Sequence, residues 1–137
     1  MSNILIVEDD SRLRHVCRFC ITHGMPEARA DDVGDGLQAL QLAQTNHYDL
    51  VITDLNLPSL NGRDLYTTLR KDRITRNLQT PAFLFCSGVR TALNSVTDFC
   101  RDGRNFMIEK PYTVDHLLEC VRMLIKAPPV TSHYTQA

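Results

Sequence analysis

Charged side chains stand where three short apolar segments of this sequence end. Glu8 and Asp9 follow the first segment, Asp54 ends the second, and Glu109 and Lys110 follow the third. Carboxylate oxygens are the ligands that hard cations such as Mg²⁺ prefer. A carboxylate can also attack a phosphoryl group and form an acyl phosphate. These residue types therefore predict a small metal and phosphoryl-transfer site, provided that the fold brings them together.

The predicted metal site needs oxygen ligands from more than one strand end. Asp9 and Asp54 could each supply one carboxylate oxygen, and the backbone carbonyl of Asn56 could supply a third. Glu8 would hold a metal-bound water from behind these ligands, since Mg²⁺ usually keeps several waters. Asp54 would then be both a metal ligand and the nucleophile.

Two further residues could neutralise the charge of a transferred phosphoryl group. Lys110 carries an ammonium, and Ser87, at the end of another apolar run, carries a hydroxyl. Alignment and charge neutralisation are the main contributions of a protein to phosphoryl transfer. Pro111 follows the lysine, which predicts a fixed turn, with a cis peptide bond as one form, that aims Lys110 inward.

Five apolar segments would have to position these residues as β-strands. They alternate with helical patterns, which favours repeated βα units and a parallel sheet. In such a sheet, ligands bind outside the carboxyl ends of the strands. Arg29, Asp31 and Asp32 leave the second segment little apolar surface, so we expect it at a polar edge. The predicted strands are residues 4–7, 28–33, 50–53, 82–86 and about 105–109.

Five helices are predicted between and after these strands, the third over about residues 62–72. Ser11 is a candidate cap for the first helix and Thr113 for the last. Apolar residues three and four apart predict one buried face for each helix. The expected inward residues are Leu13, Val16, Cys17, Cys20 and Ile21 in the first helix, Ala39, Leu40 and Ala43 in the second, Leu65, Tyr66 and Leu69 in the third, Leu93, Val96, Phe99 and Cys100 in a single fourth helix, and Val114, Leu117, Leu118, Val121 and Ile125 in the last.

Length and composition indicate one globular domain. The chain has 137 residues, of which 43% are hydrophobic, with 15 Lys and Arg against 16 Asp and Glu. We expect a domain over residues 1–126 and a disordered tail over residues 127–137. A formal charge of −1 gives no general attraction to nucleic acid or to an anionic membrane. The basic run at 70–73 is interpreted as a solvated helix end.

No segment reaches the roughly 18 apolar residues of a membrane span, and no secretory signal is visible at the start. We therefore expect a cytoplasmic protein with neither nucleic acid nor membrane as a partner. The five cysteines include Cys17 and Cys20, which are spaced as C-x-x-C inside a helical pattern. We interpret the cysteines as reduced core residues rather than as a redox or zinc site.

Taken in order, these segments resemble the receiver domain of two-component response regulators, over about residues 3–126. The resemblance implies a flavodoxin-like α/β fold, a doubly wound five-stranded parallel sheet of order 2-1-3-4-5 with five helices. It implies Asp54 as the phosphoacceptor, Glu8 and Asp9 as the acidic pair, Ser87 as the hydroxyl that follows the phosphoryl group, and Lys110 as its salt-bridge partner. The matching segments are Ile4-Leu-Ile-Val-Glu8-Asp9-Asp10, Asp49-Leu-Val-Ile-Thr-Asp54-Leu-Asn-Leu-Pro58, Asn61-Gly62, Cys86-Ser87-Gly88 and Glu109-Lys110-Pro111.

The resemblance also implies partners. The phosphodonor would be a histidine kinase or a histidine phosphotransfer protein, and Mg²⁺ would be the cofactor. A downstream protein would contact the face formed by the fourth helix, the fifth strand and the fifth helix. We expect a single-domain response regulator that signals through protein contacts and catalyses only its own phosphorylation and dephosphorylation. A phosphatase of the haloacid dehalogenase type, which also uses an aspartate nucleophile at a strand end, is a third candidate, but it would need an aspartate where Asn56 stands.

Two features depart from the family pattern. Receivers commonly carry Tyr or Phe three residues before the lysine, and this chain has Met107 there, with Phe106 on the opposite face by strand alternation. Either Met107 acts as the switch residue together with Ser87, or a bulge brings Phe106 round. The spacing from Ser87 to Lys110 also suggests one extra residue within 88–103. A weakly switching or pseudo-receiver binding module is therefore the alternative function.

Overall fold

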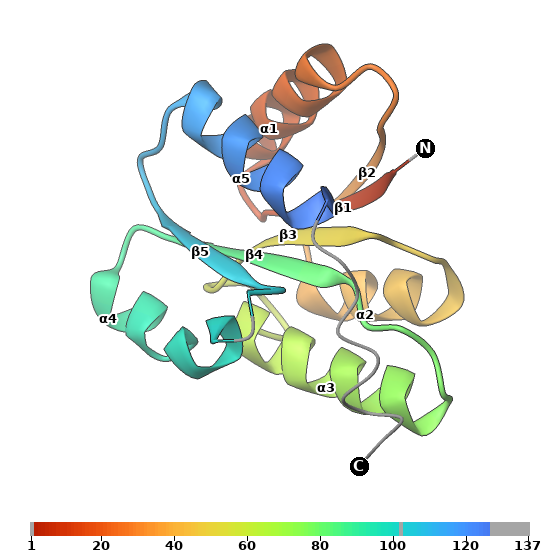
Figure 1. Cartoon of the computed structure of the whole chain (residues 1–137). Helices are drawn as coiled ribbons and strands as arrows, with labels where there is room; N and C mark the ends of the chain where they lie inside the picture. Colours follow the sequence, from red (N-terminus) through yellow and green to blue (C-terminus); the bar gives the residue numbers. More distant parts are fainter. Residues whose placement is uncertain (1, 102, 127–137) are drawn as a thin grey trace.

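The computed structural model describes residues 2–101 and 103–126, which form a parallel sheet between two layers of helices (Figure 1). The predicted tail at 127–137 lies outside the described residues. The strand order is β2-β1-β3-β4-β5, which confirms the doubly wound order expected from the sequence, and the acid-rich β2 occupies an edge. The strands are β1 (Asn3–Val7), β2 (Arg29–Val33), β3 (Leu50–Asp54), β4 (Ala82–Ser87) and β5 (Phe106–Glu109).

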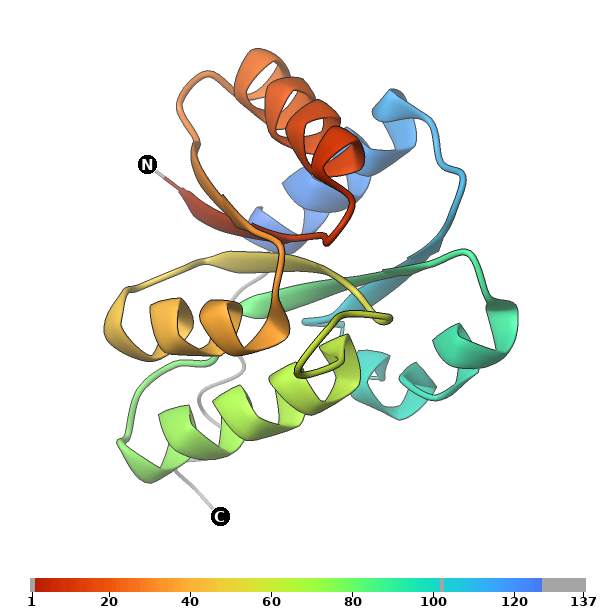
Figure 2. The same ribbon diagram turned by 180° about the vertical axis from the view of Figure 1, so that it is seen from behind.

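The helices cover both faces of the sheet. The two opposite views show α1 (Ser11–Gly24) and α5 (Val114–Lys126) on one side of the sheet and α2 (Gly36–Thr45), α3 (Gly62–Thr75) and α4 (Arg90–Asn94) on the other (Figures 1 and 2). The 3₁₀ helix η1 (Thr97–Cys100) lies in the same layer as α4. None of the helices formed by the described residues has the length and apolar character needed to cross a membrane.

Alternate side chains of the central strands enter two separate cores. In β1, Ile4 and Ile6 pack beneath α1 and α5, whereas Leu5 and Val7 pack toward α2 and α3. Each of the four is at most 1% exposed. Since successive strand residues point to opposite faces, a strand covered on both sides must be apolar throughout. A charged residue such as Glu8 can therefore follow only where the strand ends.

Two helix caps were predicted, and one prediction is wrong. Asp10, not Ser11, caps α1, because its carboxylate accepts hydrogen bonds from the first amides of the helix at 2.9 and 3.3 Å. Aspartate reaches these amides as well as serine does, and here it stands one position earlier. Thr113 does cap α5, since its hydroxyl accepts from the His116 amide at 3.1 Å.

The buried helix faces are narrower than the apolar pattern predicts. Cys17 and Ile21 of α1 are buried, but Leu13 and Val16 are 48% and 58% exposed. Val114 of α5 is also 47% exposed. Leu13 and Val114 lie in the first turns of their helices. These turns stand beside the strand ends that carry the acids.

The predicted single fourth helix is two short pieces. α4 ends at Asn94, and the chain then turns before η1. The Ser95 hydroxyl donates to the Ala92 carbonyl at 2.6 Å, and β-branched Val96 and Thr97 follow. Serine and β-branched residues are weak helix formers, so the helix stops here. Val96 is nevertheless fully buried, which anchors the turn to the core.

The basic end of α3 is only partly solvated. Arg73 is 7% exposed, and its guanidinium donates to the carbonyls of Gln79 at 2.9 Å and Ala43 at 3.4 Å. The helix runs on to Thr75, beyond the predicted end. The interpretation of this run as solvated is therefore wrong for Arg73, which fastens α3 to α2 and to the connection before β4.

Candidate functional site

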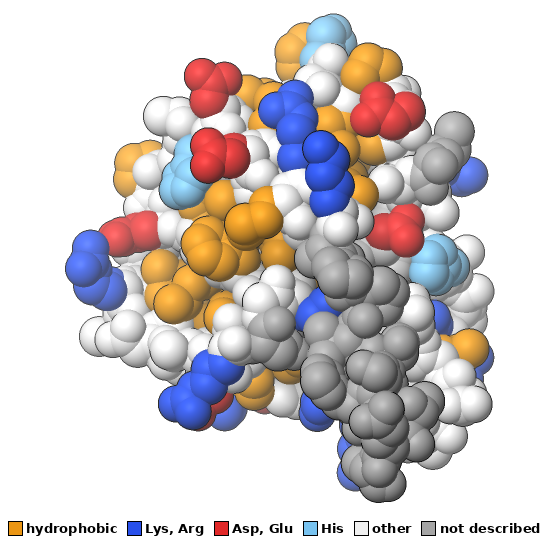
Figure 3. Space-filling model, viewed as in Figure 1, with side chains coloured by type: hydrophobic (Ala, Val, Ile, Leu, Met, Phe, Trp, Pro, Cys, Tyr) orange, Lys and Arg blue, Asp and Glu red, His pale blue; other side chains and the backbone are white. Residues whose placement is uncertain are grey.

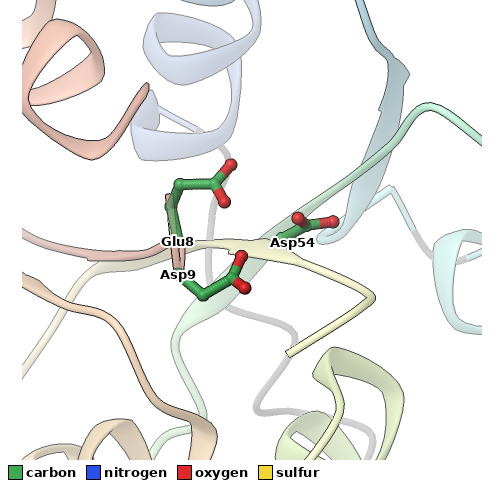
Figure 4. Close-up of side chains that lie close together, drawn as sticks. All are labelled: Glu8, Asp9 and Asp54. Carbon is green, nitrogen blue, oxygen red and sulfur yellow. The ribbon is translucent and has the colours of Figure 1, made fainter. Parts of the chain in front are cut away.

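The carboxyl ends of β1 and β3 bring three acids together (Figure 4). One carboxylate oxygen from each of Glu8, Asp9 and Asp54 lies within 4.8 Å of the other two. Val7 pairs with Thr53 in register, so the residues that follow emerge side by side. Glu8 is buried, Asp54 is half-buried and Asp9 is exposed, so the cluster opens to solvent on one side.

Lys110 brings a positive charge to the same cluster from the end of β5. Its ammonium donates one hydrogen bond to Glu8 and another to Asp54 at 3.3 Å. Its own amide donates to the Ser87 carbonyl at 2.8 Å, which fixes the backbone of the lysine against β4. The Lys110–Pro111 peptide bond is cis, and the side chain points inward as the sequence predicts.

Burial and charge act against each other in the Glu8–Lys110 pair. Burial raises the pKa of Glu8, and this outweighs the hydrogen bonds from Lys110 and from the Asp10 amide, which lower it. Burial also acts to lower the pKa of Lys110, but the hydrogen bond to Glu8 and the negative charge of Asp54 outweigh it, so that pKa is raised. The ammonium therefore stays charged beside the acids.

Ser87 lies at the end of β4 and is 3% exposed. Asp54 of β3 pairs with Cys86, so Ser87 stands one residue beyond the register position of Asp54. The hydroxyl oxygen of Ser87 accepts a hydrogen bond from the Val89 amide at 3.0 Å. The same oxygen that would face a phosphoryl group therefore also holds the residue that precedes α4.

The loop after Asp54 is packed tightly against the aspartate. The Asn56 amide donates to the Asp54 carboxylate at 3.4 Å, and the side chain of Asn56 is exposed. The Gly62 amide donates to the Leu55 carbonyl at 3.0 Å. A Cβ atom at Gly62 would lie 2.4 Å from the Asp54 carbonyl oxygen, so only glycine allows this approach. The start of α3 thus rests directly on the backbone of Asp54.

The two candidate switch residues lie on opposite faces of β5. Pairing with β4 is continuous from Phe106 to Glu109, so no bulge turns Phe106 round. Phe106 is 40% exposed. Met107 is partly buried and packs against the core beneath α3 and η1. Of the two geometric possibilities, the structure places Met107, not Phe106, on the side of α4.

Two residues near the site were not singled out from the sequence. Tyr112 lines the hollow beside Glu8, and burial raises its pKa well above the ordinary value. Arg14 donates to the Glu8 carbonyl at 2.8 Å and pairs with Asp32 at 2.9 Å. Tyr112 stands two residues after Lys110, and this position was the one sequence feature that could have pointed to it. No sequence pattern links Arg14 to Glu8.

Three of the five cysteines have the buried surroundings expected of core residues. All five are free; Cys17, Cys86 and Cys120 are buried, whereas Cys20 and Cys100 are partly exposed. Burial raises the pKa of Cys17 to about 12 and the pKa of Cys86 well above its ordinary value. Since the thiolate is the reactive and metal-binding form, these surroundings disfavour redox or zinc chemistry.

Comparison with known proteins decides the family. The model of the response regulator receiver domain family matches residues 4–122, which include all three acids, Ser87 and Lys110. The chain belongs to this family. The match confirms the resemblance expected from the sequence, and it makes the chain the receiver module of a two-component response regulator.

The curated relatives are longer than this chain. Response regulator ArlR of Staphylococcus aureus is 30% identical over 132 residues, which cover 94% of this chain and 55% of ArlR. The chain therefore spans about half the length of the curated relatives it matches.

Solved structures of receiver domains share the fold. The receiver domain of the hybrid histidine kinase CckA is 25% identical, with a TM-score of 0.71 over 91% of this chain and 100% of that one. The receiver domain of sensor histidine kinase PA1611 from Pseudomonas aeruginosa PAO1 is 23% identical, with a TM-score of 0.72 over 92% of this chain and 98% of that one. That structure contains a magnesium ion coordinated in its active-site cleft.

Proposed function

We propose that Asp54 accepts a phosphoryl group from the phosphohistidine of a histidine kinase or of a histidine phosphotransfer protein, with Mg²⁺ as cofactor. A carboxylate oxygen of Asp54 attacks phosphorus, and the phosphorus–nitrogen bond breaks. Its electron pair leaves with the imidazole, which takes up a proton from water. The observation that carries this proposal is the acid cluster itself, with the Lys110 ammonium 3.3 Å from Asp54.

The charge and the donor set of the cluster fit Mg²⁺. Three carboxylates and one ammonium give the cluster a formal net charge of −2, which a divalent cation balances. Asp9 and Asp54 would supply carboxylate oxygens, the Asn56 carbonyl a third oxygen, and Glu8 would hold a coordinated water. The magnesium in the PA1611 receiver supports this assignment. When bound, the ion supplies charge neutralisation between Asp54 and the incoming phosphoryl group.

Lys110 and Ser87 would hold the phosphoryl group once it is attached. The ammonium already donates to Asp54, so it can pass to a phosphoryl oxygen without a large movement. Ser87 can donate its hydroxyl hydrogen to another of these oxygens. Turning toward Asp54 would withdraw the Ser87 oxygen from the Val89 amide, so phosphorylation would loosen the start of α4.

The signal would pass to a partner protein through the face formed by α4, β5 and α5. Hydrophobic side chains gather along β5, between α4 and α5 (Figure 3). Exposed apolar residues on or beside these elements are Val89, Phe106, Val114 and Met123. Apolar side chains that a monomer leaves exposed together are typical of protein contacts. The action of the chain as a single-domain regulator stays a prediction, because its curated relatives extend beyond the matched part.

Intact-mass measurement after incubation with acetyl phosphate and Mg²⁺ tests the proposal. The wild-type chain should gain the mass of one phosphoryl group, and Asp54→Asn should gain none. Omission of Mg²⁺ should abolish the gain in the wild type. The proposal is wrong if Asp54→Asn gains the same mass as the wild type, or if the wild type gains none.

Met107 at the place of the usual aromatic residue supports a second candidate, a receiver that switches weakly and acts mainly as a binding module. Beryllofluoride, which imitates an attached phosphoryl group, separates the two. Amide spectra that change only at Asp54 and its immediate neighbours would favour the second candidate. Changes that reach α4 and β5 would favour the first.

A further inference from the structure

An arginine of α3 ties the start of that helix to the segment made of α4, the following turn and η1, residues 90–100. Arg63 is the second residue of α3, and its guanidinium lies 5.5 Å from the centre of the Phe99 ring in η1. Its Nε–H also donates to the Ser95 carbonyl at 3.3 Å. One side chain thus contacts both the turn after α4 and η1.

The segment 90–100 has little helical stability of its own. α4 has five residues and no side-chain cap, and η1 is a four-residue 3₁₀ turn without one. Helices this short are not stable alone, and 3₁₀ hydrogen bonds have poor geometry. Its position therefore depends on contacts with the rest of the protein. These include its buried residues Leu93 and Val96, the Arg90–Glu109 ion pair, the hydrogen bond from Asn105 to the Phe99 carbonyl, and the two contacts of Arg63.

β5 carries Met107 where receivers commonly carry an aromatic residue, and Phe99 of η1 packs on the same face of the sheet. Its ring lies 4.7 Å from that of Tyr66 and 6.2 Å from that of Phe85, measured between centroids. Met107, the register partner of Phe85, packs against the same cluster. The aromatic residue on this face therefore comes from the segment itself, and Arg63 covers it from the α3 side.

Both ends of this connection lead back to the acid site. Arg63 follows Gly62, which rests on the Asp54 carbonyl, so the base of the arginine is fixed to the phosphoacceptor strand. At the other end, the Val89 amide just before α4 is held by the Ser87 hydroxyl. If phosphorylation breaks the contact between Ser87 and the Val89 amide, the hydrogen bond from Arg63 to Ser95 remains as a polar contact that holds the segment.

We propose that Arg63 is a latch that holds residues 90–100 in the unphosphorylated position, and so sets how far phosphorylation of Asp54 shifts this segment. The inference rests on the proposed function and deepens it. Arg63 touches neither the phosphoryl group nor the metal ligands, so it is a positioning residue that acts through Phe99 and Ser95. Because coupling between two sites is reciprocal, weakening the latch must strengthen binding of a phosphoryl mimic at Asp54.

The test is beryllofluoride affinity in the presence of Mg²⁺, measured by amide chemical shifts on the full chain. Arg63→Ala should bind at least about fivefold more tightly than wild type, as expected for loss of a cation–π contact together with a hydrogen bond. Amide shifts of residues 90–100 in free Arg63→Ala should already move toward the bound positions. Phe99→Leu keeps most of the packing but removes the aromatic face, so it should show the same trend.

Two control variants distinguish loss of the Arg63 contacts from loss of positive charge and from a general loss of stability. Lys71→Ala removes a positive charge from the same helix about two turns further on, and its affinity should equal that of wild type. Arg63→Lys keeps the charge but loses the Nε donor, so it should fall between wild type and Arg63→Ala. A purely structural role would weaken binding in the variants rather than strengthen it.

Unchanged or weaker binding in Arg63→Ala and Phe99→Leu, with wild type binding normally, overturns the latch and leaves the proposed function standing. A wild-type chain that binds no beryllofluoride with Mg²⁺ present overturns both. If Arg63→Ala fails to fold, the comparison of wild type with Arg63→Lys and Phe99→Leu decides the outcome.

Discussion

Lys110 is the residue that connects the ends of β1, β3 and β5. Its ammonium donates to Glu8 and to Asp54. Burial acts to lower the pKa of Lys110, but the two acids raise it by more, so the ammonium keeps its charge. Before any metal or phosphoryl group binds, the lysine offsets part of the repulsion among the carboxylates. The lysine and a divalent cation would therefore compete for the same negative charge.

Removal of this charge gives a prediction at the residue scale. Lys110→Gln should bind Mg²⁺ roughly tenfold more tightly than wild type, since a positive charge a few ångströms from the ion no longer opposes it. The same variant should be phosphorylated much more slowly, because the phosphoryl charge loses its partner. A Mg²⁺ titration followed by amide chemical shifts measures the first effect. Weaker Mg²⁺ binding in Lys110→Gln would contradict this view of the site.

At the scale of elements, the alternation of strands and helices and the convergence of Asp9, Asp54 and Lys110 could be predicted from the sequence. Buried parallel strands are apolar throughout and end at the first charged residue, which is a strong local signal. The break between α4 and η1 could not be predicted in this way. Ser95, Val96 and Thr97 weaken the helix locally, but the break also depends on burial of Val96 in the core and on the hydrogen bond from Arg63 to Ser95, contacts between residues far apart in the chain. The Arg14 contact to Glu8 spans only six residues, but no periodic pattern of the sequence pairs these two positions.

The Asn105 side chain connects β4, α3 and η1. Its amide group is buried, accepts from the Phe83 amide at 2.9 Å and donates to the Tyr66 hydroxyl at 3.1 Å and the Phe99 carbonyl at 2.8 Å. Asn105→Ala would leave these buried groups unpaired and should lower the free energy of unfolding by about 3 kcal/mol. Urea denaturation measures this, with the exposed Asn94→Ala as the control. Equal stability of the two variants would show that Asn105 does not hold η1, β4 and α3 together.

In the molecule as a whole, the two faces of the sheet are buried in two cores, and the residues of the candidate site lie at the carboxyl ends of the strands. The acids, the lysine and the serine all lie at the carboxyl ends of the strands, where a doubly wound sheet exposes its ligand site. The cores themselves contain reactive residue types that the fold keeps inert. Burial raises the pKa of Cys17 to about 12, so very little thiolate exists near neutral pH.

Thiol labelling of the folded chain tests this division. At mildly alkaline pH, a disulfide reagent should modify the half-buried Cys20 and Cys100 first, and Cys17, Cys86 and Cys120 should react only as fast as the protein opens. All of the cysteines should react at once in denaturant, which serves as the control. Peptide mapping identifies the labelled positions. Labelling of Cys17 as rapid as that of Cys20 would contradict the buried environment of Cys17.

The most direct test of the central claim is the location of the phosphoryl group. Borohydride reduces an acyl phosphate on aspartate to homoserine, which peptide mapping detects at a single position. After treatment with acetyl phosphate and Mg²⁺, we predict homoserine at position 54 and aspartate unchanged at positions 9 and 10. Homoserine at position 9 or 10, or at none of the three, would contradict the assignment of Asp54 as the phosphoacceptor.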